Sequence, residues 1–151
     1  MVVKTVDLWD AARDKALEIG LEPMLLTTVL TGDAFSAGRF FSAVAISALH
    51  NGLPIKPPCM IFATGETFVR LEKDKKFGLG GANQEIALSG CIDLKEDDNR
   101  IVICSVDSDG TDGPTNLAGG MTDYTTISLS LIHISEPTRP LYISYAVFCL
   151  K

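Results

Sequence analysis

The sequence predicts an α/β fold, in which helices and strands alternate around a buried mixed sheet. Two observations support this prediction. Segments with the apolar spacing of a helix alternate along the chain with short apolar runs that are rich in β-branched residues. Glycine and proline mark most of the junctions between these segments, where they would end one element and start the next.

The first part of the chain is expected to form two helices with a strand between them. Residues 6–19 have apolar residues at helical spacing. Residues 24–30 are a continuous apolar run with threonine, which indicates a buried strand. Residues 31–33 are expected to turn into a helix over residues 34–50, which ends before Gly52.

Two further strands and a third helix are expected in the middle of the chain. Residues 59–63 and 67–71 are predicted to be strands on either side of a turn at residues 64–66. The glycine-rich residues 78–81 then open a helix over residues 82–94.

An acidic, glycine-rich loop is the most informative part of the sequence. A charged loop at residues 95–99 precedes a β-branched strand at residues 101–104, which leads into residues 105–116, SVDSDGTDGPTN. Open α/β sheets place ligand sites where their strands end, and carboxylates and turn N–H groups there can hold Mg²⁺ and phosphate. The candidate residues of this loop are Asp107, Asp109, Gly110, Thr111 and Asp112.

The acidic loop is open to two other interpretations. An ordinary surface turn would also contain aspartate and glycine. A calcium-binding EF-hand loop needs glycine at its sixth position and a bidentate glutamate at its twelfth. Counted from Asp107, those positions are Asp112 and Ala118, so the spacing excludes an EF-hand.

The glycine loop at residues 78–88, GLGGANQEIAL, is a second candidate site. Gly80 and Gly81 precede a helix N-terminus, where free N–H groups and the helix dipole favour anions. The segment lacks the Gly-Lys-Ser/Thr of a P-loop, and Asn83 takes the place of the last glycine of a dinucleotide fingerprint. Glu85 could instead only stabilise the helix dipole, and Glu66 could be a simple turn carboxylate.

Charge and cysteine content limit the classes of partner and compartment. The net charge is −6 and no lysine or arginine cluster is present, which argues against nucleic acid and anionic membranes as partners. Cys59, Cys91 and Cys104 show no paired spacing, and no signal peptide follows Met1, so a cytoplasmic location is expected. His50 is the only histidine before residue 129, which leaves no histidine-based metal cluster or catalytic triad.

The C-terminal tail resembles translated sequencing-library adapter. Residues 129–139, LSLIHISEPTR, and residues 143–150, ISYAVFCL, match two adapters in the right order and frame, with three residues between them in place of an index. Residues 129–151 are therefore expected to be a non-native tail whose deletion leaves thermal stability unchanged. Without this tail the net charge is near −7, against −6 for the whole chain.

Four motifs in order resemble class II glycerate kinases over residues 5–126. They are LTGDAFSAGR, ATGETFVRL, GLGGANQEIAL and DSDGTDGPTNLAGG, which begin at residues 30, 63, 78 and 107. The resemblance implies a MOFRL-type C-terminal domain over residues 23–128. Residues 1–22 would be a remnant of the N-terminal domain or a connecting helix. The chain would thus belong to a two-domain kinase and be truncated at both ends.

The resemblance also implies a reaction and a set of site residues. Such kinases use ATP and Mg²⁺ to phosphorylate D-glycerate, usually to 2-phosphoglycerate, in a cleft formed with the missing N-terminal domain. Catalytic roles would fall to Asp107, Asp109, Asp112 and Glu66, with Asp107 and Asp109 as metal ligands. Phosphate or substrate would be bound by Gly80, Gly81, Asn83, Glu85, Gly110 and Thr111. A homodimer of the full-length parent protein is also compatible with the resemblance.

The sequence departs from the family pattern in ways that keep alternatives open. Many members have arginine where this chain has Ala82, and alanine cannot supply that fork of donors to phosphate. A downstream TGPTGTN-like motif and most of the N-terminal domain are missing, so residues 1–128 alone are expected to lack kinase activity. The alternatives are a hydroxypyruvate reductase and a non-catalytic binding or regulatory domain.

Overall fold

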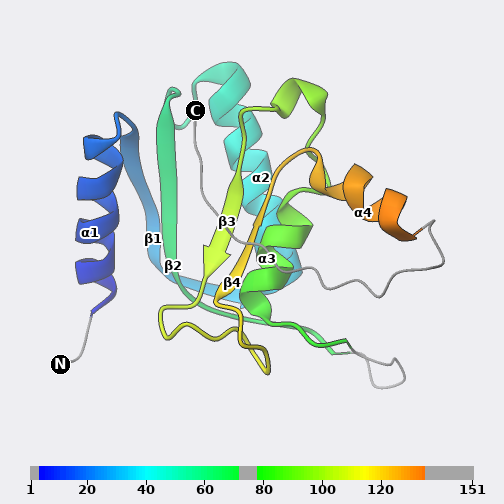
Figure 1. The fold of residues 1–151 in the computed structure, drawn as a ribbon. Helices are drawn as coiled ribbons and strands as arrows, with labels where there is room; N and C mark the ends of the chain where they lie inside the picture. The colour runs from blue at the N-terminus through cyan, green and yellow to red at the C-terminus, as the bar shows by residue number, and fades with distance from the viewer. Residues whose placement is uncertain (1–3, 72–77, 135–151) are drawn as a thin grey trace.

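The computed structural model describes residues 4–71 and 78–134, with side chains described up to residue 130. It confirms the α/β class, with helices and strands alternating along the chain (Figure 1). In chain order the elements are α1 (Thr5–Glu18), β1 (Glu22–Asp33), α2 (Ala34–Asn51), β2 (Cys59–Phe68), α3 (Ala82–Gly90), the 3-10 helix η1 (Glu96–Asp98), β3 (Ile103–Val106), β4 (Gly119–Thr122) and α4 (Thr126–Ile134).

The strands form two two-stranded sheets in the described residues, one parallel and one antiparallel. β1 and β2 run parallel, from the pair Glu22 and Cys59 to the pair Asp33 and Phe68. β3 and β4 run antiparallel, with Val106 opposite Gly119. Parallel and antiparallel pairing are therefore both present, but in two separate small sheets, and most side chains of β1 and β2 remain partly exposed.

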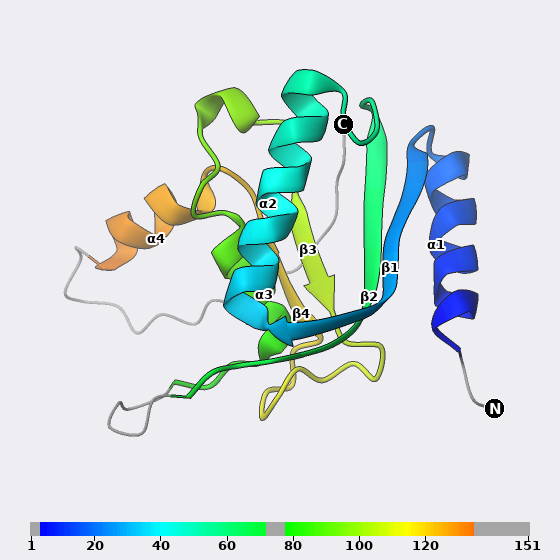
Figure 2. The ribbon, with the colours of Figure 1, turned by 180° about the vertical axis from the view of Figure 1, so that it is seen from behind.

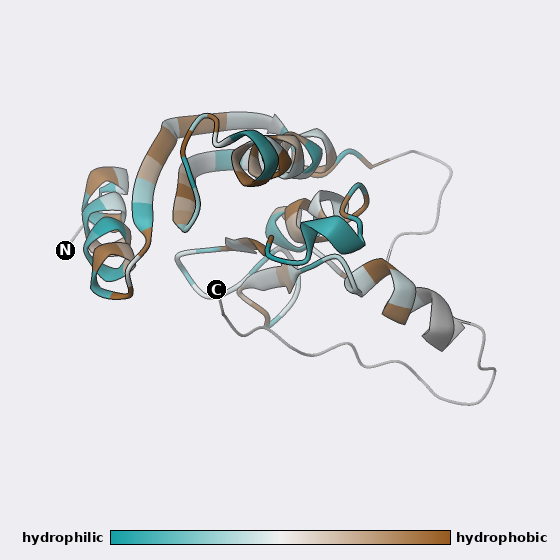
Figure 3. Ribbon diagram, turned by 90° about the horizontal axis from the view of Figure 1, so that it is seen from above, coloured by the Kyte–Doolittle hydropathy of each residue, from teal (hydrophilic) through white to brown (hydrophobic). Residues whose placement is uncertain are grey.

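The helices cover these sheets in a simple order. Helix α1 lies along the β1–β2 pair, where the rings of Trp9 and Phe62 have their centroids 5.8 Å apart (Figures 1 and 2). Helix α2 packs against α3, and α3 in turn packs against β3 and β4. In the view from above, α1 lies on one side of the β1–β2 pair, and α2, α3 and the β3–β4 pair lie on the other (Figure 3).

Two apolar clusters hold α2 and α3 to the rest of the fold. One consists of Cys91, Leu94, Ile101 and Ile103, all buried, with side chains from α2, Tyr124 and Ile127 packed around it. The other joins Ala34, Ala37 and Ile86 at the start of α2 and α3. The small alanines allow the two helices to approach closely, which places the N-terminus of α3 beside the end of β1.

Several predicted boundaries were wrong. The turn predicted at residues 64–66 is part of β2, because Gly65 pairs with Leu30 and a Cβ there would fall on the Leu30 backbone. Likewise β1 continues to Asp33 through the turn predicted at residues 31–33. A single longer parallel pair thus replaces the two short strands expected around that turn.

The third helix and the last strands also differ from the prediction. Helix α3 ends at Gly90 instead of residue 94. A Cβ on Gly90 would press on the Ile103 side chain. The strand predicted at residues 101–104 is shifted to Ile103–Val106, because the Ile101 N–H is held by the Asp98 carbonyl at 2.9 Å. The sequence analysis missed β4 entirely, since GGMT has little β-propensity.

The predicted tail boundary falls inside a helix. Helix α4 crosses residue 128, and the Leu129 N–H donates to the Thr125 carbonyl at 3.0 Å. The Leu129 side chain is 52% exposed. Residues 135–151, which hold most of the tail, lie outside the described residues, so its adapter origin stays a prediction.

A buried carboxylate ties η1 to the end of α2 and carries a stability prediction. Asp98 Oδ1 lies 2.7 Å from His50 Nε2, and Asp98 Oδ2 accepts the Lys95 N–H at 2.9 Å. Burial raises the pKa of Asp98, but the hydrogen bonds from His50 and Lys95 outweigh it, so the pKa lies below its ordinary value. The stabilisation is present at neutral pH and is lost as the pH falls through this lowered value.

We therefore expect Asp98→Asn to lower the free energy of unfolding at pH 7 by about 1–3 kcal/mol, the usual cost of breaking a hydrogen bond to a buried charge. The difference from wild type should shrink as the pH falls below the ordinary aspartate range. Urea unfolding at several pH values measures both effects. The neighbouring exposed Asp97→Asn is the matched control; an equal loss in the two variants would contradict the prediction.

Candidate functional site

The acidic loop between β3 and β4 is docked on the N-terminus of α3 by one buried carboxylate. Asp112 is 2% exposed. Its Oδ1 accepts the backbone N–H of Asn83 at 3.0 Å, and its Oδ2 accepts that of Gln84 at 2.7 Å. The carboxylate thus caps α3 from a segment almost thirty residues away in sequence, and its charge also suits the positive end of the helix dipole.

Glycines make this close approach possible. A Cβ on Gly81 would fall on the Asp112 carboxyl group and 2.6 Å from the Asp112 carbonyl carbon. Gly113 has a φ of 59°, and a Cβ there would lie 2.6 Å from the Gly80 carbonyl oxygen. Gly81 and Gly113 therefore permit the close packing between the two motifs.

Polar side chains add further links between α3 and the loop. Gln84 Nε2 donates to Thr115 Oγ1 at 3.0 Å, and the Thr115 hydroxyl donates to the Asp112 carbonyl at 2.8 Å. The Ser105 hydroxyl donates to Asn83 Oδ1 at 2.6 Å. The side chain of Asn83, predicted to face phosphate or substrate, is therefore occupied by contacts within the fold.

The outer part of the loop presents the remaining acids to solvent. Asp107 is half-buried, whereas Asp109, Gly110 and Thr111 are exposed. Asp109 Oδ1 accepts both the Thr111 N–H at 2.9 Å and the Thr111 hydroxyl at 3.0 Å. These bonds, the backbone one first, lower the pKa of Asp109 and keep it a carboxylate at neutral pH.

This arrangement fits a magnesium ion that a substrate helps to bind. Mg²⁺ usually takes one or two carboxylates together with phosphate oxygens and water. Asp107 and Asp109 supply two carboxylates on one exposed loop, linked by the Asp109 N–H to Asp107 Oδ1 at 3.3 Å. No three metal-binding side chains of the His, Cys, Asp and Glu types gather anywhere in the described residues.

The other predicted acids lie around the ends of β1 and β2. Glu66 is an exposed residue of β2 and pairs with Thr31 of β1. Glu85 is partly buried, its Oε2 has no hydrogen-bond partner among the described residues, and burial together with the charge of Asp33 raises its pKa. The ends of these strands, the start of α3 and the acidic loop occupy the same end of the molecule (Figures 1 and 2).

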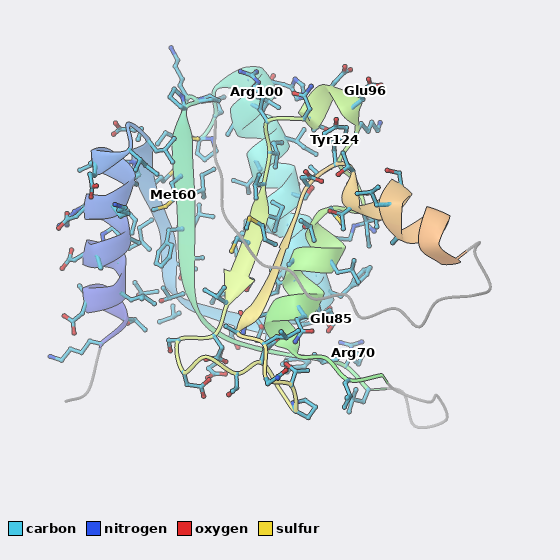
Figure 4. The ribbon with its side chains drawn as sticks, viewed as in Figure 1. Met60, Arg70, Glu85, Glu96, Arg100 and Tyr124 are labelled. Carbon is cyan, nitrogen blue, oxygen red and sulfur yellow. The ribbon has the colours of Figure 1, made fainter. Side chains whose placement is uncertain are left out.

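The sequence analysis gave no role to two charged residues at this end, Asp33 and Arg70. Asp33 caps α2 by accepting the Ser36 N–H at 3.0 Å and the Ser36 hydroxyl at 2.7 Å, and these bonds lower its pKa, with a smaller contribution from the charge of Arg70. Figure 4 labels Arg70 and Glu85. The charge of Arg70 helps to lower the pKa of Asp33, and the charge of Asp33 helps to raise the pKa of Glu85. The Asp-x-x-Ser spacing at residue 33 was a sequence signal for the cap. Arg70 lies within the motif ATGETFVRL, but the sequence gave no reason to assign it a role.

Ala82 itself is not part of a polar site. Its side chain packs on the cluster of Ala34, Ala37 and Ile86. A shallow hollow lined by Leu17, Leu21 and Lys56 lies at the opposite end of β1 and contains none of the predicted site residues.

Comparison with known proteins places these motifs in a family. The model of the MOFRL family matches residues 59–142, which include β2, α3 and the acidic loop. The chain belongs to the MOFRL family. The match covers both motifs that meet at Asp112, and it extends past residue 128, where the sequence analysis ended the domain.

Relatives of this MOFRL chain have enzyme names. It is 41% identical over 117 residues to "Glycerate 2-kinase" of Pyrococcus horikoshii, covering 78% of this chain and 26% of the relative. It is 39% identical over 117 residues to "D-glycerate 2-kinase" of Thermotoga maritima, covering 78% and 27%. A protein of Agrobacterium vitis named "Putative hydroxypyruvate reductase" is 41% identical over 112 residues, covering 74% and 29%.

A solved structure has the same fold. The crystal structure of glycerate kinase from Thermotoga maritima superposes with a TM-score of 0.79 at 36% identity, covering 86% of the MOFRL chain and 31% of that chain. The MOFRL chain thus spans between a quarter and a third of the length of these relatives. None of the helices that the structure describes is both long and apolar enough to cross a membrane.

Proposed function

We propose that this chain forms part of the catalytic unit of an ATP- and Mg²⁺-dependent glycerate kinase, which phosphorylates D-glycerate to 2-phosphoglycerate. One observation carries the proposal: an acidic loop and a glycine-rich helix start are packed together at Asp112, in a chain about 40% identical to relatives named as glycerate 2-kinases. Phosphoryl transfer needs positioning and charge stabilisation more than covalent chemistry, and these two motifs suit that need.

In this proposal Asp107 and Asp109 hold the metal, which when bound would neutralise charge on the transferred phosphoryl group. The N–H groups of Asn83 and Gln84 already donate to Asp112, so the backbone before them, at Gly80 and Gly81, would face the phosphate or the glycerate carboxylate. Gly110 and Thr111 would shape the outer loop against the substrate. Glu66 and Glu85 would line the same end of the cleft.

Positive charge in this site would come from Arg70, since Ala82 supplies none. The charge of Arg70 reaches Asp33 at the end of β1, beside the first turn of α3. A guanidinium there would offset the carboxylates of Asp33 and Glu85 when a phosphate approaches. The remaining surface of the cleft would be supplied by an N-terminal domain.

A chimeric enzyme tests the proposed function. Residues 22–128 would replace the matching segment of the Thermotoga maritima relative, and the resulting enzyme would be assayed with ATP, Mg²⁺ and D-glycerate. We expect ATP-dependent formation of 2-phosphoglycerate, with the unmodified relative as the reference. A folded chimera, shown by a cooperative thermal transition, that forms no phosphoglycerate would contradict the proposal.

A second candidate, hydroxypyruvate reductase, is favoured only by the name of the Agrobacterium vitis relative. The described residues contain no dinucleotide fingerprint, because Asn83 stands where its last glycine would be. The same chimera, incubated with NADH and hydroxypyruvate, should therefore leave NADH absorbance unchanged. Steady NADH consumption would favour this candidate over the kinase.

A further inference from the structure

We infer that Asp112 is a positioning residue: its carboxylate locks the acidic loop onto the N-terminus of α3 and does not itself bind metal or substrate. The inference rests on the proposed function only for the reaction that the loop serves. From the sequence, Asp112 was predicted to be catalytic like Asp107 and Asp109, whereas only the latter two were predicted to be metal ligands. Its surroundings in the fold are different from theirs.

Asp112 differs from the other two acids in its burial and in the hydrogen bonds that its oxygens accept. Asp112 is 2% exposed, whereas Asp109 is exposed and Asp107 half-buried. Its two oxygens accept N–H groups of Asn83 and Gln84, with Asn83 Nδ2 as a third donor at 3.3 Å. A carboxylate surrounded by donors at a helix N-terminus is satisfied where it is, and reaching a metal would leave those donors unpaired.

The backbone around Asp112 also favours the contact between its carboxylate and α3. The Asp112 N–H donates to the Leu117 carbonyl at 2.7 Å, which closes the loop, while Gly81 leaves room for its carboxyl group. Just before it in the chain, the Asp107 N–H donates to the Ala118 carbonyl at 2.6 Å. The Asp112 contact therefore determines where the segment with Asp107 and Asp109 lies relative to Gly80 and Gly81.

The consequence concerns the helix N-terminus as an anion site. The N–H groups of Asn83 and Gln84 are those that would otherwise hold a phosphate. Asp112 fills that place with an internal anion. A substrate phosphate would then be directed to the glycine segment before α3, next to the exposed acids, instead of onto the helix axis.

Amide hydrogen exchange of the full 151-residue chain tests this role without any assay of activity. Asp112→Ala and Gly81→Ala should each speed exchange of the Asn83 and Gln84 amides by about tenfold or more, since each removes the cap. The double variant should be no faster than the worse single one, because both changes break one contact. Asp107→Asn should leave these two amides unchanged.

Unchanged protection of both amides in Asp112→Ala, or additive effects in the double variant, would overturn the inference. If Asp112→Ala does not fold, Asp112→Asn keeps one acceptor oxygen and should give an intermediate increase in exchange. No increase in that variant would overturn the inference as well.

The chimeric enzyme separates positioning from metal binding. There Gly81→Ala and Asp112→Asn should lower kcat to a similar extent, with the loss not restored by excess Mg²⁺. Rescue of Asp112→Asn, but not of Gly81→Ala, by excess Mg²⁺ would show that Asp112 is a metal ligand. An inactive but folded parent chimera would count against the proposed function alone, because the exchange experiment still decides the role of Asp112.

Discussion

Gly38→Ala is expected to be strongly destabilising, although it adds a single methyl group inside a helix. A Cβ at Gly38 would fall on the Ser89 hydroxyl and the Ile86 carbonyl oxygen, and 3.0 Å from the Gly90 nitrogen. Two of these three atoms belong to the backbone of α3, which cannot move aside as a side-chain end could. The α2–α3 contact would have to open, and with it both apolar clusters.

Overpacking of this kind costs about 1–3 kcal/mol or more, and the gain of about 1 kcal/mol from placing alanine instead of glycine in a helix offsets only part of it. We therefore expect a net loss of about 2 kcal/mol in the free energy of unfolding, measured by urea denaturation. Gly78→Ala is the control, because no atom lies within 4 Å of its Cβ position and its φ is not in the left-handed region. A Gly38→Ala variant as stable as wild type would show that α2 and α3 are farther apart than the structure has them.

Asp107→Asn in the chimeric kinase should lower kcat by on the order of 10²- to 10⁴-fold, the range typical for a positioned catalytic side chain. The change removes a negative charge without changing the size of the side chain. Asp107 is half-buried, and among the described residues its carboxylate accepts only the Asp109 N–H, at 3.3 Å. Its loss should therefore change the melting temperature by less than about 2 °C.

Steady-state kinetics and thermal unfolding of the same preparation check both parts of this expectation. Asp97→Asn, an equal change of charge on the exposed 3-10 helix, should retain full activity. Full activity in Asp107→Asn would remove this residue from the metal site. A large drop in melting temperature would assign it to the fold instead.

Local signals in the sequence predicted the helices better than the strands. The apolar spacing at residues 6–19 and 34–50 corresponds closely to α1 and α2, because helical periodicity is a property of the segment itself. The prediction missed β4 and divided β2 in two. Gly119 and Gly65 do not favour a strand by themselves, and each lies in one because it pairs with a neighbouring strand. Strand pairing is a contact between distant segments, so a single segment carries little of its signal.

The site shows the same division. The sequence alone identified the candidate motifs of the site: an acidic loop after a strand, and a glycine-rich helix start with Asn83, Gln84 and Glu85. It also predicted the family, and both motifs lie within the residues that the MOFRL model matches. Residue type and order are enough for this, since the donors, carboxylates and glycines of a site are written directly in the chain.

The surroundings of each acid, by contrast, follow only from the tertiary structure. Asp107, Asp109 and Asp112 are chemically identical in sequence, yet one is buried against the amides of α3 while another is exposed on the outer loop. The proximity of Arg70 to Asp33 likewise arises only when the ends of β1 and β2 meet. The role of a carboxylate depends on its solvation and its donors, and segments far apart along the chain supply both.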